Sequence, residues 1–547
     1  MPVSNPSGCH LASPLVGSSY AEHIVARLSD FFSEMTPWQR RLWDAGTVLT
    51  LRELLEAADW CANGVLSTGT VAWLAKDAER LAGRDRGVGE REVRTQLTKV
   101  LRSNVPHGSR HYRHLSELIA FVNRDYMSGW ERAVEATTPA SPERCARAIA
   151  SHLLDCGYSM RYLRTWVGAL RSSNGATLAD LFDSAQELAN GTARTYDVVV
   201  PFASLPKYKE LAVPIDNWMS VGQMRDWLEP ASALVDGLRL NGGFRYSVCA
   251  KDGFAAAEQV INTIDRLKAR SNHGRRIGRR GPQPSGDVWV KGDGRIQTIA
   301  LAKESRAAFV LSLEAERKVY QVSTPTAVDD ALELAAPLNY GPPGPAVSGG
   351  WAAIEALLTT PDADDARDGR GVVAVDRMAA LVAASWPRGE LTTLSRRHTP
   401  PVPDRLSLEL KTNEVNSERA RITAEAIRSG RKLSLKKATD RASESRMAHL
   451  IANPRPTLED VNAHMRTALR RFYRQRNILM HGGTTNSIAL STALRTAAPL
   501  VSAGLDRITH AALVEGITPL QLAARAKLNL ELVGSSDGRH LVDLLEP

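Results

Sequence analysis

Arg476-Asn477-Ile478-Leu479-Met480-His481-Gly482-Gly483 ends a long basic stretch of this 547-residue chain and decides the fold expected around it. Apolar residues recur at helical spacing before this stretch, which predicts an amphipathic helix from 458 to 481. The paired glycines predict the end of that helix, with Gly482 or Gly483 in the left-handed conformation. The sequence therefore places an arginine and a histidine in the last two turns of a long helix.

A helical wheel separates this segment into two faces. The apolar face consists of Val461, Met465, Ala468, Leu469, Phe472 and Leu479. The opposite face, which is expected to turn away from the core, carries Arg470, Arg474, Asn477 and His481. Arg476 falls within the apolar face, so its side chain must pair with a buried carboxylate or reach a cleft. An ideal helix separates Arg476 from His481 by about 140° around its axis, so either the last turn loosens or a dimer completes the site.

The spacing of arginine and histidine five positions apart is not specific by itself. It occurs three times in a chain with 13 His and 69 Lys and Arg. Pro106 interrupts the pair Arg102 and His107, while the pair in the segment 147–152 lies in an ordinary amphipathic helix. Only Arg476 and His481 are accompanied by an asparagine, by terminal glycines and by a preceding basic helix.

The motif Arg-Asn-x-x-x-His-Gly-Gly resembles the active-site motif of HEPN-domain ribonucleases. The stretch from Gly349 to Leu358, with its Trp-x-Ala-aliphatic-Glu-x-Leu pattern, is similar to the first helix of the ApeA-like bacterial HEPN group. The resemblance covers 349–530 and implies a helical bundle with helices near 373–386, 417–450, 458–481 and 487–515. About 120 residues separate Glu355 from Arg476, more than a minimal bundle needs.

The resemblance implies a metal-independent endoribonuclease that leaves a 2′,3′-cyclic phosphate. Arg476 and His481 would be catalytic together with Asn477, which would orient the histidine or contact phosphate. The expected RNA-binding residues are Arg470, Arg471 and Arg474. Glu355 and Tyr473 are candidate supporting residues, although Glu355 fits a surface position equally well. HEPN domains typically pair, so a homodimer is expected, and the biological role by analogy is anti-phage defence, abortive infection or a toxin.

Composition limits the other function classes. Hydrophobic residues make up 43% and charged residues 24% of the chain, as in globular proteins. The sequence shows neither a membrane span nor a signal peptide, and its five cysteines form no Cys-x-x-Cys pair, so a cytoplasmic protein without structural zinc is expected. It has no phosphate-binding Gly-Lys-Ser/Thr loop and no Gly-x-Ser-x-Gly turn. We therefore expect no cofactor and no metal.

Charge supports an RNA substrate. The chain carries a formal net charge of +9, and 396–476 contains nineteen Lys and Arg against nine Asp and Glu. A basic field beside a phosphate-handling motif suits RNA, and solvated helix faces in a generally arginine-rich chain are the alternative explanation.

The expected fold is mainly α, with a helical region at 18–194, a small α+β domain at 195–325 and the HEPN-like bundle at 349–530. Residues 1–17 are expected to be disordered, 326–348 to form a linker and 531–547 a tail. Strands are predicted at 196–200 and 244–250, a hairpin at 287–301 and a strand pair at 309–322. A basic loop at 272–285 contains Arg275, Arg276, Arg279 and Arg280 and either touches nucleic acid or is simply solvated.

The leading hypothesis is an endoribonuclease whose amino-terminal region senses a phage-derived or protein trigger. The alternative is a non-catalytic protein that binds RNA or a partner, in which the motif is structural. A third is a nucleic-acid-binding regulator that uses the α+β domain as a ligand sensor. The arrangement of Arg476 and His481 around one cleft, in one chain or across a two-fold axis, distinguishes an enzyme from the binding proteins.

Overall fold

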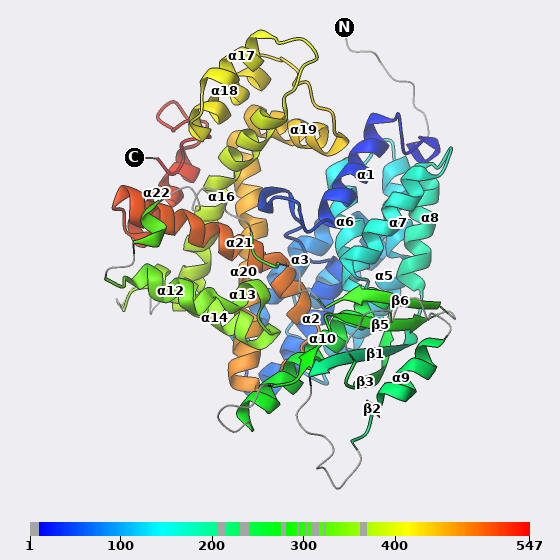
Figure 1. Ribbon diagram of the computed structural model, residues 1–547. Coiled ribbons are helices and arrows are strands. Elements are labelled where there is room, and N and C mark those ends of the chain that lie inside the picture. Colours follow the sequence, from blue (N-terminus) through cyan, green and yellow to red (C-terminus); the bar gives the residue numbers. More distant parts are fainter. Residues whose placement is uncertain are drawn as a thin grey trace. The chain divides into compact units, whose positions relative to one another are not determined.

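The computed structural model describes residues 10–204, 215–229, 240–274, 281–292, 295–301, 305–308, 317–321, 324–361 and 369–546. As expected, the chain is mainly helical and carries one small antiparallel sheet (Figure 1). It divides into two compact units. The first consists of Met1–Asp155, Val167–Gln186 and Ser305–Pro547, and the second of Cys156–Trp166 and Glu187–Glu304.

The amino-terminal part of the chain is helical. Its α-helices are α1 (Ser19–Phe31), α2 (Thr47–Ala62), α3 (Thr68–Arg84), α4 (Arg91–Leu101), α5 (Arg110–Glu135), α6 (Pro142–Asp155), α7 (Met160–Ser172) and α8 (Leu178–Asn190). Helix α6 starts at Pro142, and the Ser141 hydroxyl accepts a hydrogen bond from Arg144 N at 3.3 Å. Thr50 lies inside α2, three residues after its start.

The carboxyl-terminal part of the first unit is a second set of helices. These are α12 (Ala327–Ala335), α13 (Pro337–Tyr340), α14 (Pro343–Leu358), α16 (Arg370–Arg397), α17 (Arg405–Thr412), α18 (Asn416–Arg428), α19 (Ala438–Ala452), α20 (Pro454–Gly482), α21 (Leu490–His510), a π-helical turn (Ala511–Glu515) and α22 (Pro519–Leu532). Helix α16 is central, because it packs against α14 and α18–α22 (Figure 1). Its residues are buried around much of its circumference, as a helix surrounded by others requires.

The two helical regions are not separate domains, which corrects the expected boundaries. Helix α1 packs on both α6 and α19, and Trp43 from the amino-terminal region belongs to the same buried cluster as α14, α16 and α20. A local reading of the sequence cannot detect this, because each helix has the same amphipathic pattern whichever helix covers it.

The expected linker at 326–348 is also wrong, since α12, α13 and the start of α14 occupy it. Pro343 stands in the first turn of α14, where its missing N–H is not needed. A Cβ placed on Gly349 would lie 2.1 Å from Leu334 O, and one on Gly350 would lie 3.1 Å from the Phe472 ring. These glycines therefore let α14 approach its neighbours closely and do not loosen the chain.

The expected tail at 531–547 is packed against the bundle. Five of its apolar side chains are buried: Val533, Leu541, Val542, Leu544 and Leu545. Asn529 Nδ2 donates to Leu544 O at 2.7 Å, which holds this segment on α22. Burial of these residues explains why the segment is ordered although it contains little regular structure.

The second unit is built on the antiparallel sheet. Its elements are β1 (Arg194–Ser204), β2 (Trp218–Met219), α9 (Val221–Leu228), β3 (Gly243–Ala250), α10 (Gly253–His273), β4 (Gln283–Pro284), β5 (Asp287–Gly292) and β6 (Arg295–Ala300). The strand order is β2-β3-β1-β5-β6, and β4 pairs with β1. Val198 and Val200 pack toward α10, whereas Val199 packs toward α9, so β1 is buried on both faces.

The predicted strands at 196–200 and 244–250 and the hairpin at 287–301 are confirmed. The strand pair expected at 309–322 lies largely outside the described residues, and Arg317–Tyr320 form a 3-10 helix. Arg275, Arg276, Arg279 and Arg280 of the basic loop lie outside the described residues as well.

Candidate functional site

Helix α20 carries the whole Arg-Asn-x-x-x-His-Gly-Gly motif at its carboxyl end. Gly483 adopts the predicted left-handed conformation with φ of 66°, and its N–H donates to Leu479 O at 3.1 Å. His481 is exposed in the last turn of α20. The local sequence therefore positions the histidine as expected.

Arg476 is half-buried and is held by its neighbour in sequence. Its Nη1 donates to Asn477 Oδ1 at 3.1 Å. Within the described part of the chain, no carboxylate lies within ion-pair distance of its guanidinium. The alternative that Arg476 neutralises a core carboxylate is therefore not observed among those residues, and the charge is available to an anion.

The other two arginine–histidine pairs are engaged in ion pairs. Arg147 bonds Asp44 at 2.6 Å and Glu143 at 3.0 Å, and His152 stacks on Tyr126. In the first pair, Arg102 bonds Glu79 and His107 bonds Asp59, both at 2.6 Å. Arg147 is therefore held between two carboxylates, with 18% of its side chain exposed. The geometry therefore singles out Arg476 among the three arginines.

Arg471 and Arg474 are buried against the amino-terminal region. Glu53 of α2 accepts Arg471 Nε at 2.8 Å and Arg474 Nη2 at 2.9 Å, and Thr50 accepts a further bond from Arg471 at 3.2 Å. Burial raises the pKa of Glu53, but the two guanidinium groups outweigh it and hold that pKa below its usual value. The prediction that this part of α20 turns a basic face away from the core is therefore wrong, because α2 covers it.

Arg470 is also held by the amino-terminal region. Its guanidinium lies over the Trp73 ring, 3.1 Å from the centroid, and 3.9 Å from carboxylate oxygens of both Asp77 and Asp376. Burial lowers the pKa of Arg470 to about 10, although both carboxylates oppose that shift. Only 13% of its side chain is exposed, so of the three expected phosphate-binding arginines none is freely accessible in this arrangement.

The candidate supporting residues lie on the other side of the motif helix. Tyr473 packs on Trp351, with ring centroids 4.5 Å apart, and Trp351 Nε1 donates to Glu355 at 3.0 Å. Among the described residues, no ion pair joins Glu355 to Arg476. Glu355 therefore orients the tryptophan that packs on α20 and does not brace the arginine directly.

Helix α2 continues along the end of the motif helix. Glu56 accepts Ser487 Oγ at 2.8 Å and Ile488 N at 3.1 Å, just beyond the motif. Trp60 lies 3.2 Å from where a Cβ on Gly482 would stand. Residues 53, 56 and 60 recur at helical spacing, so one face of α2 follows α20 and the loop after it. This contact surface was not foreseen from the sequence.

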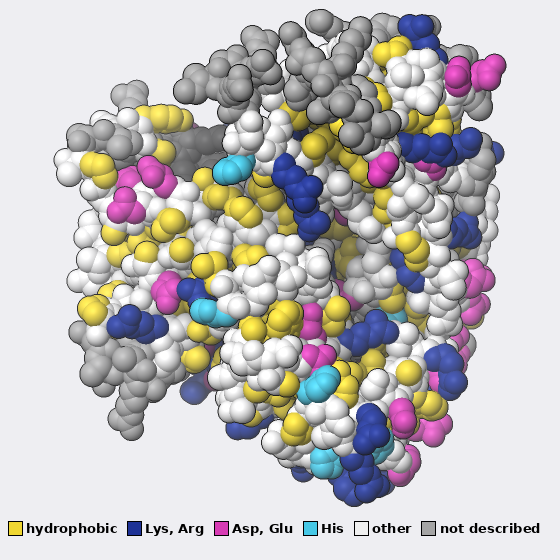
Figure 2. All heavy atoms as spheres, turned by 90° about the horizontal axis from the view of Figure 1, so that it is seen from below, with side chains coloured by type: hydrophobic (Ala, Val, Ile, Leu, Met, Phe, Trp, Pro, Cys, Tyr) yellow, Lys and Arg dark blue, Asp and Glu magenta, His cyan; other side chains and the backbone are white. Residues whose placement is uncertain are grey.

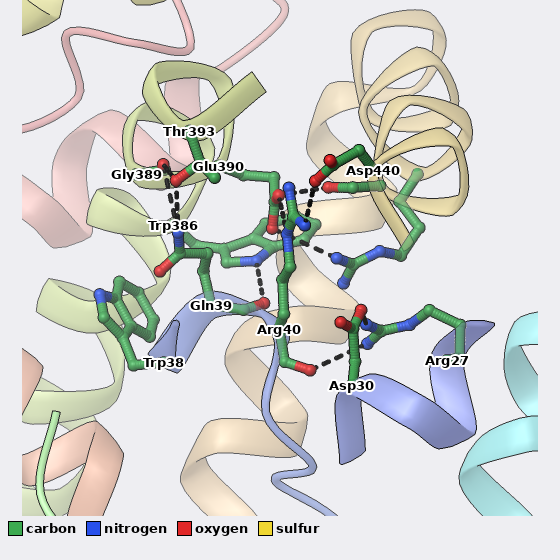
Figure 3. Close-up of polar contacts among 12 residues, drawn as sticks. Arg27, Asp30, Trp38, Gln39, Arg40, Trp386, Gly389, Glu390, Thr393 and Asp440 are labelled. Atoms are coloured by element: carbon green, nitrogen blue, oxygen red, sulfur yellow. Dashed lines mark hydrogen bonds and ion pairs between the residues drawn. The ribbon is translucent and has the colours of Figure 1, made fainter. Parts of the chain in front are cut away.

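A second buried network joins the segment after α1 to α16 and α19 (Figure 3). Arg40 donates to Glu390 and Asp440, both at 2.7 Å, and Arg446 pairs with Glu390 at 3.2 Å. Gln39 Nε2 donates to the Thr393 hydroxyl at 2.9 Å beside it. Buried ion pairs of this kind are costly to break, so they fix the amino-terminal region on the bundle.

Ion pairs neutralise much of the basic surplus in 396–476. Several acidic partners come from the amino-terminal region. Glu22 pairs with Arg441, Glu53 with Arg471 and Arg474, and Asp77 with Arg470. Figure 2 shows Lys and Arg side chains interspersed with acidic and apolar ones on the face it presents. The net charge of a sequence window therefore overstates the positive field of this segment.

Within the described ranges, no group of three or more His, Cys, Asp or Glu side chains is arranged to hold a metal ion. No helix of the described residues is long and apolar enough to cross a membrane. The chain matches no protein-family model, and neither a curated protein nor a solved structure is significantly similar to it.

Proposed function

We propose that this protein is a metal-independent endoribonuclease of the HEPN type, whose reaction takes place at the carboxyl end of α20. The observation that carries the proposal is the half-buried Arg476, which bonds Asn477 and has no acidic partner among the described residues, five residues before the exposed His481. A guanidinium without a carboxylate is suited to a phosphate.

The chemistry assigns each group a role. The ribose 2′-OH loses its proton and attacks the adjacent phosphorus, the 5′-oxygen leaves and takes up a proton, and a 2′,3′-cyclic phosphate forms. His481 transfers a proton in this step, and the Arg476 fork stabilises the charge on the phosphoryl oxygens. Asn477 holds Arg476 through its Oδ1, which fixes the direction of the fork.

A second copy of the chain completes the site in this proposal. An ideal helix turns Arg476 and His481 about 140° apart, so one chain does not readily direct both at a single phosphate. Met480 and Ile488 flank the motif with exposed fractions of 56% and 49%, which offers an apolar surface to a partner. Two antiparallel copies of α20 would bring an arginine of one chain beside a histidine of the other.

The amino-terminal region is proposed to control this site through α2. The side chains of Glu53, Glu56 and Trp60 bind α20 and the loop that follows it, so a movement of α2 reaches the motif directly. A trigger that displaces α2 would expose Arg471 and Arg474 to a substrate. We further propose that the protein is cytoplasmic and acts in anti-phage defence or as a toxin.

A non-catalytic binding protein is the second candidate, and the burial of Arg471 and Arg474 favours it, since it gives these arginines a structural role. RNA cleavage separates the two. Purified protein is incubated with total bacterial RNA in EDTA, and new ends are sequenced beside those from an Arg476→Ala control. Cyclic phosphate or 3′-phosphate ends that require Arg476 support the enzyme. Activity that disappears in EDTA and returns with magnesium contradicts it.

Because a resting enzyme awaiting its trigger would leave purified RNA intact, the same two proteins are also induced in a bacterial host. Growth arrest with new cyclic phosphate ends in cellular RNA, absent for Arg476→Ala, supports the proposal. Retarded RNA without cleavage in either setting favours the binding protein.

A further inference from the structure

A pocket of about 250 Å³ lies between α12, α13 and α21, away from the residues of the proposed ribonuclease site. Its walls are largely apolar and include Ala335, Leu338 and Leu505. Its polar lining groups are Asn339, Ser502, Asp506 and Thr509. Apolar walls with few polar groups are typical of sites that bind small organic molecules, and this volume is slightly below the usual range for drug-sized ligands.

The polar groups of the lining other than Asp506 have partners within the protein. Asn339 Oδ1 accepts the Ser305 hydroxyl, Ser502 Oγ donates to Ala308 O at 3.2 Å, and Thr509 Oγ1 donates to Leu505 O at 2.7 Å. These groups therefore do not require a ligand.

Asp506 differs from the rest of the lining. Its Oδ1 is buried, and among the described residues it has neither a hydrogen-bond donor nor an ion-pair partner. Burial raises the pKa of Asp506 to about 6, a shift that the neighbouring Arg507 opposes. The group is thus a carboxylate at pH 7.5, and a buried carboxylate without a donor is destabilising until a donor reaches it.

We propose that this pocket binds a small organic amine, whose ammonium group donates to the Asp506 carboxylate while its hydrocarbon part packs against Ala335, Leu338 and Leu505. One carboxylate among apolar walls is a poor site for Mg²⁺ or Ca²⁺, which take six or more oxygen ligands. It suits an ammonium ion, which needs a few acceptors and an apolar surface for its carbon atoms. The inference rests on the pocket alone and is independent of ribonuclease activity.

The test uses the full chain and two probes of similar shape, benzylamine and benzyl alcohol, in titration calorimetry at pH 7.5. Benzylamine is expected to bind at least about tenfold more tightly than benzyl alcohol, because only the amine supplies a charge-assisted hydrogen bond to Asp506. Asp506→Asn is expected to remove this preference, while Glu333→Gln, at an exposed position of α12, retains it.

The pH dependence gives a second readout in the unaltered chain. Benzylamine affinity should fall as the pH is lowered from 7.5 to 5, because protonation of Asp506 removes the negative charge, whereas benzyl alcohol affinity should change little. Equal binding of the two probes to the unaltered chain, undiminished amine binding by Asp506→Asn, or no binding of benzylamine at millimolar concentration would each overturn the proposal.

Discussion

Arg471 Nε donates to Glu53 Oε2 at 2.8 Å, although the two residues are 418 positions apart in the sequence. Both side chains are almost completely buried. Glu53 also bonds Arg474 one turn later on α20, so a single carboxylate binds two guanidinium groups. This contact links α2 of the amino-terminal region directly to the helix that carries the candidate motif.

Glu53→Gln is expected to destabilise the protein by about 3–5 kcal/mol, because an amide leaves two buried arginines without a counter-charge. Urea denaturation at pH 7.5 measures the change in the free energy of unfolding. Glu459→Gln is the matched control: Glu459 also pairs with an arginine, Arg455, but its side chain is 62% exposed, so a change below about 0.5 kcal/mol is expected. A similar small loss in both variants would contradict the importance of the buried pair.

The sequence predicts local features of α20 well, and it fails where distant segments decide burial. The left-handed Gly483 follows from the glycine pair that stops the helix, so no tertiary information is needed. A helical wheel, in contrast, assumes that only one face is buried. Helix α20 packs on α14 and α16 with its apolar residues and binds α2 through Arg471 and Arg474, so a second, polar face is buried too.

The linker predicted at 326–348 is wrong for a related reason, because this segment contains several glycines and prolines. Such residues favour a linker when the chain is solvated, but they also favour close helix packing. Gly350 allows α14 to approach Phe472 of α20, and Pro343 suits the first helical turn. The two uses give the same local sequence, so only the neighbouring helices distinguish them. No local pattern in the sequence points to Asp506 either, because its place in a pocket depends on the packing of α12 and α13 beside α21.

Arg476→Ala and His481→Ala are each expected to abolish RNA cleavage and any toxicity of the expressed protein. Arg476→Lys should fail as well, because an ammonium group does not reproduce the planar fork. Cleavage of labelled RNA, together with circular dichroism to show that each variant folds, provides the measurement.

The controls for these variants follow from the burial of the other histidines and arginines. His152 is buried and Arg147 is paired with Asp44 and Glu143, so their replacement would disturb folding and would not test the motif. Arg455→Ala on the same helix and His449→Ala on α19 remove an exposed arginine and an exposed histidine. If these two variants lose activity as completely as the motif variants, the assignment of the site is wrong.

Asp506→Asn is expected to stabilise the ligand-free protein at pH 7.5. The pKa of Asp506 is raised to about 6 by burial, so the folded chain holds the proton more tightly than the unfolded chain. Its contribution to stability is therefore fully present below about pH 4 and is lost as the pH rises through 6.

The gain from this substitution at pH 7.5 is at most about 3 kcal/mol, and it should vanish near pH 4. Thermal and urea unfolding of both proteins across this pH range test it. Glu333→Gln, which replaces an exposed carboxylate on α12, should show no such pH-dependent difference. A gain of equal size at pH 4 and pH 7.5 would show that ionisation of Asp506 is not its cause.

Met480→Glu is expected to weaken self-association. Met480 is 56% exposed beside the motif, and a charge there would oppose burial against a second copy. Sedimentation velocity over a range of concentrations measures the change. Leu408→Glu on α17 alters a side chain of equal exposure away from the motif and should leave association unchanged. If both variants associate like the parent chain, the surface around Met480 is not the dimer interface.

Mixing an Arg476→Ala chain with a His481→Ala chain tests whether each site takes its arginine from one subunit and its histidine from the other. In the mixed dimer, one of the two sites then holds an intact arginine and an intact histidine, while the second site lacks both. Random pairing makes about half of the dimers mixed, so the mixture should regain about a quarter of the parent activity. Each variant alone should be inactive, and the recovered activity should rise with protein concentration as dimers form. Two results would exclude this composite site: an inactive mixture in which sedimentation and affinity tags show the mixed dimer, or full cleavage by the parent chain at concentrations where only monomer is present.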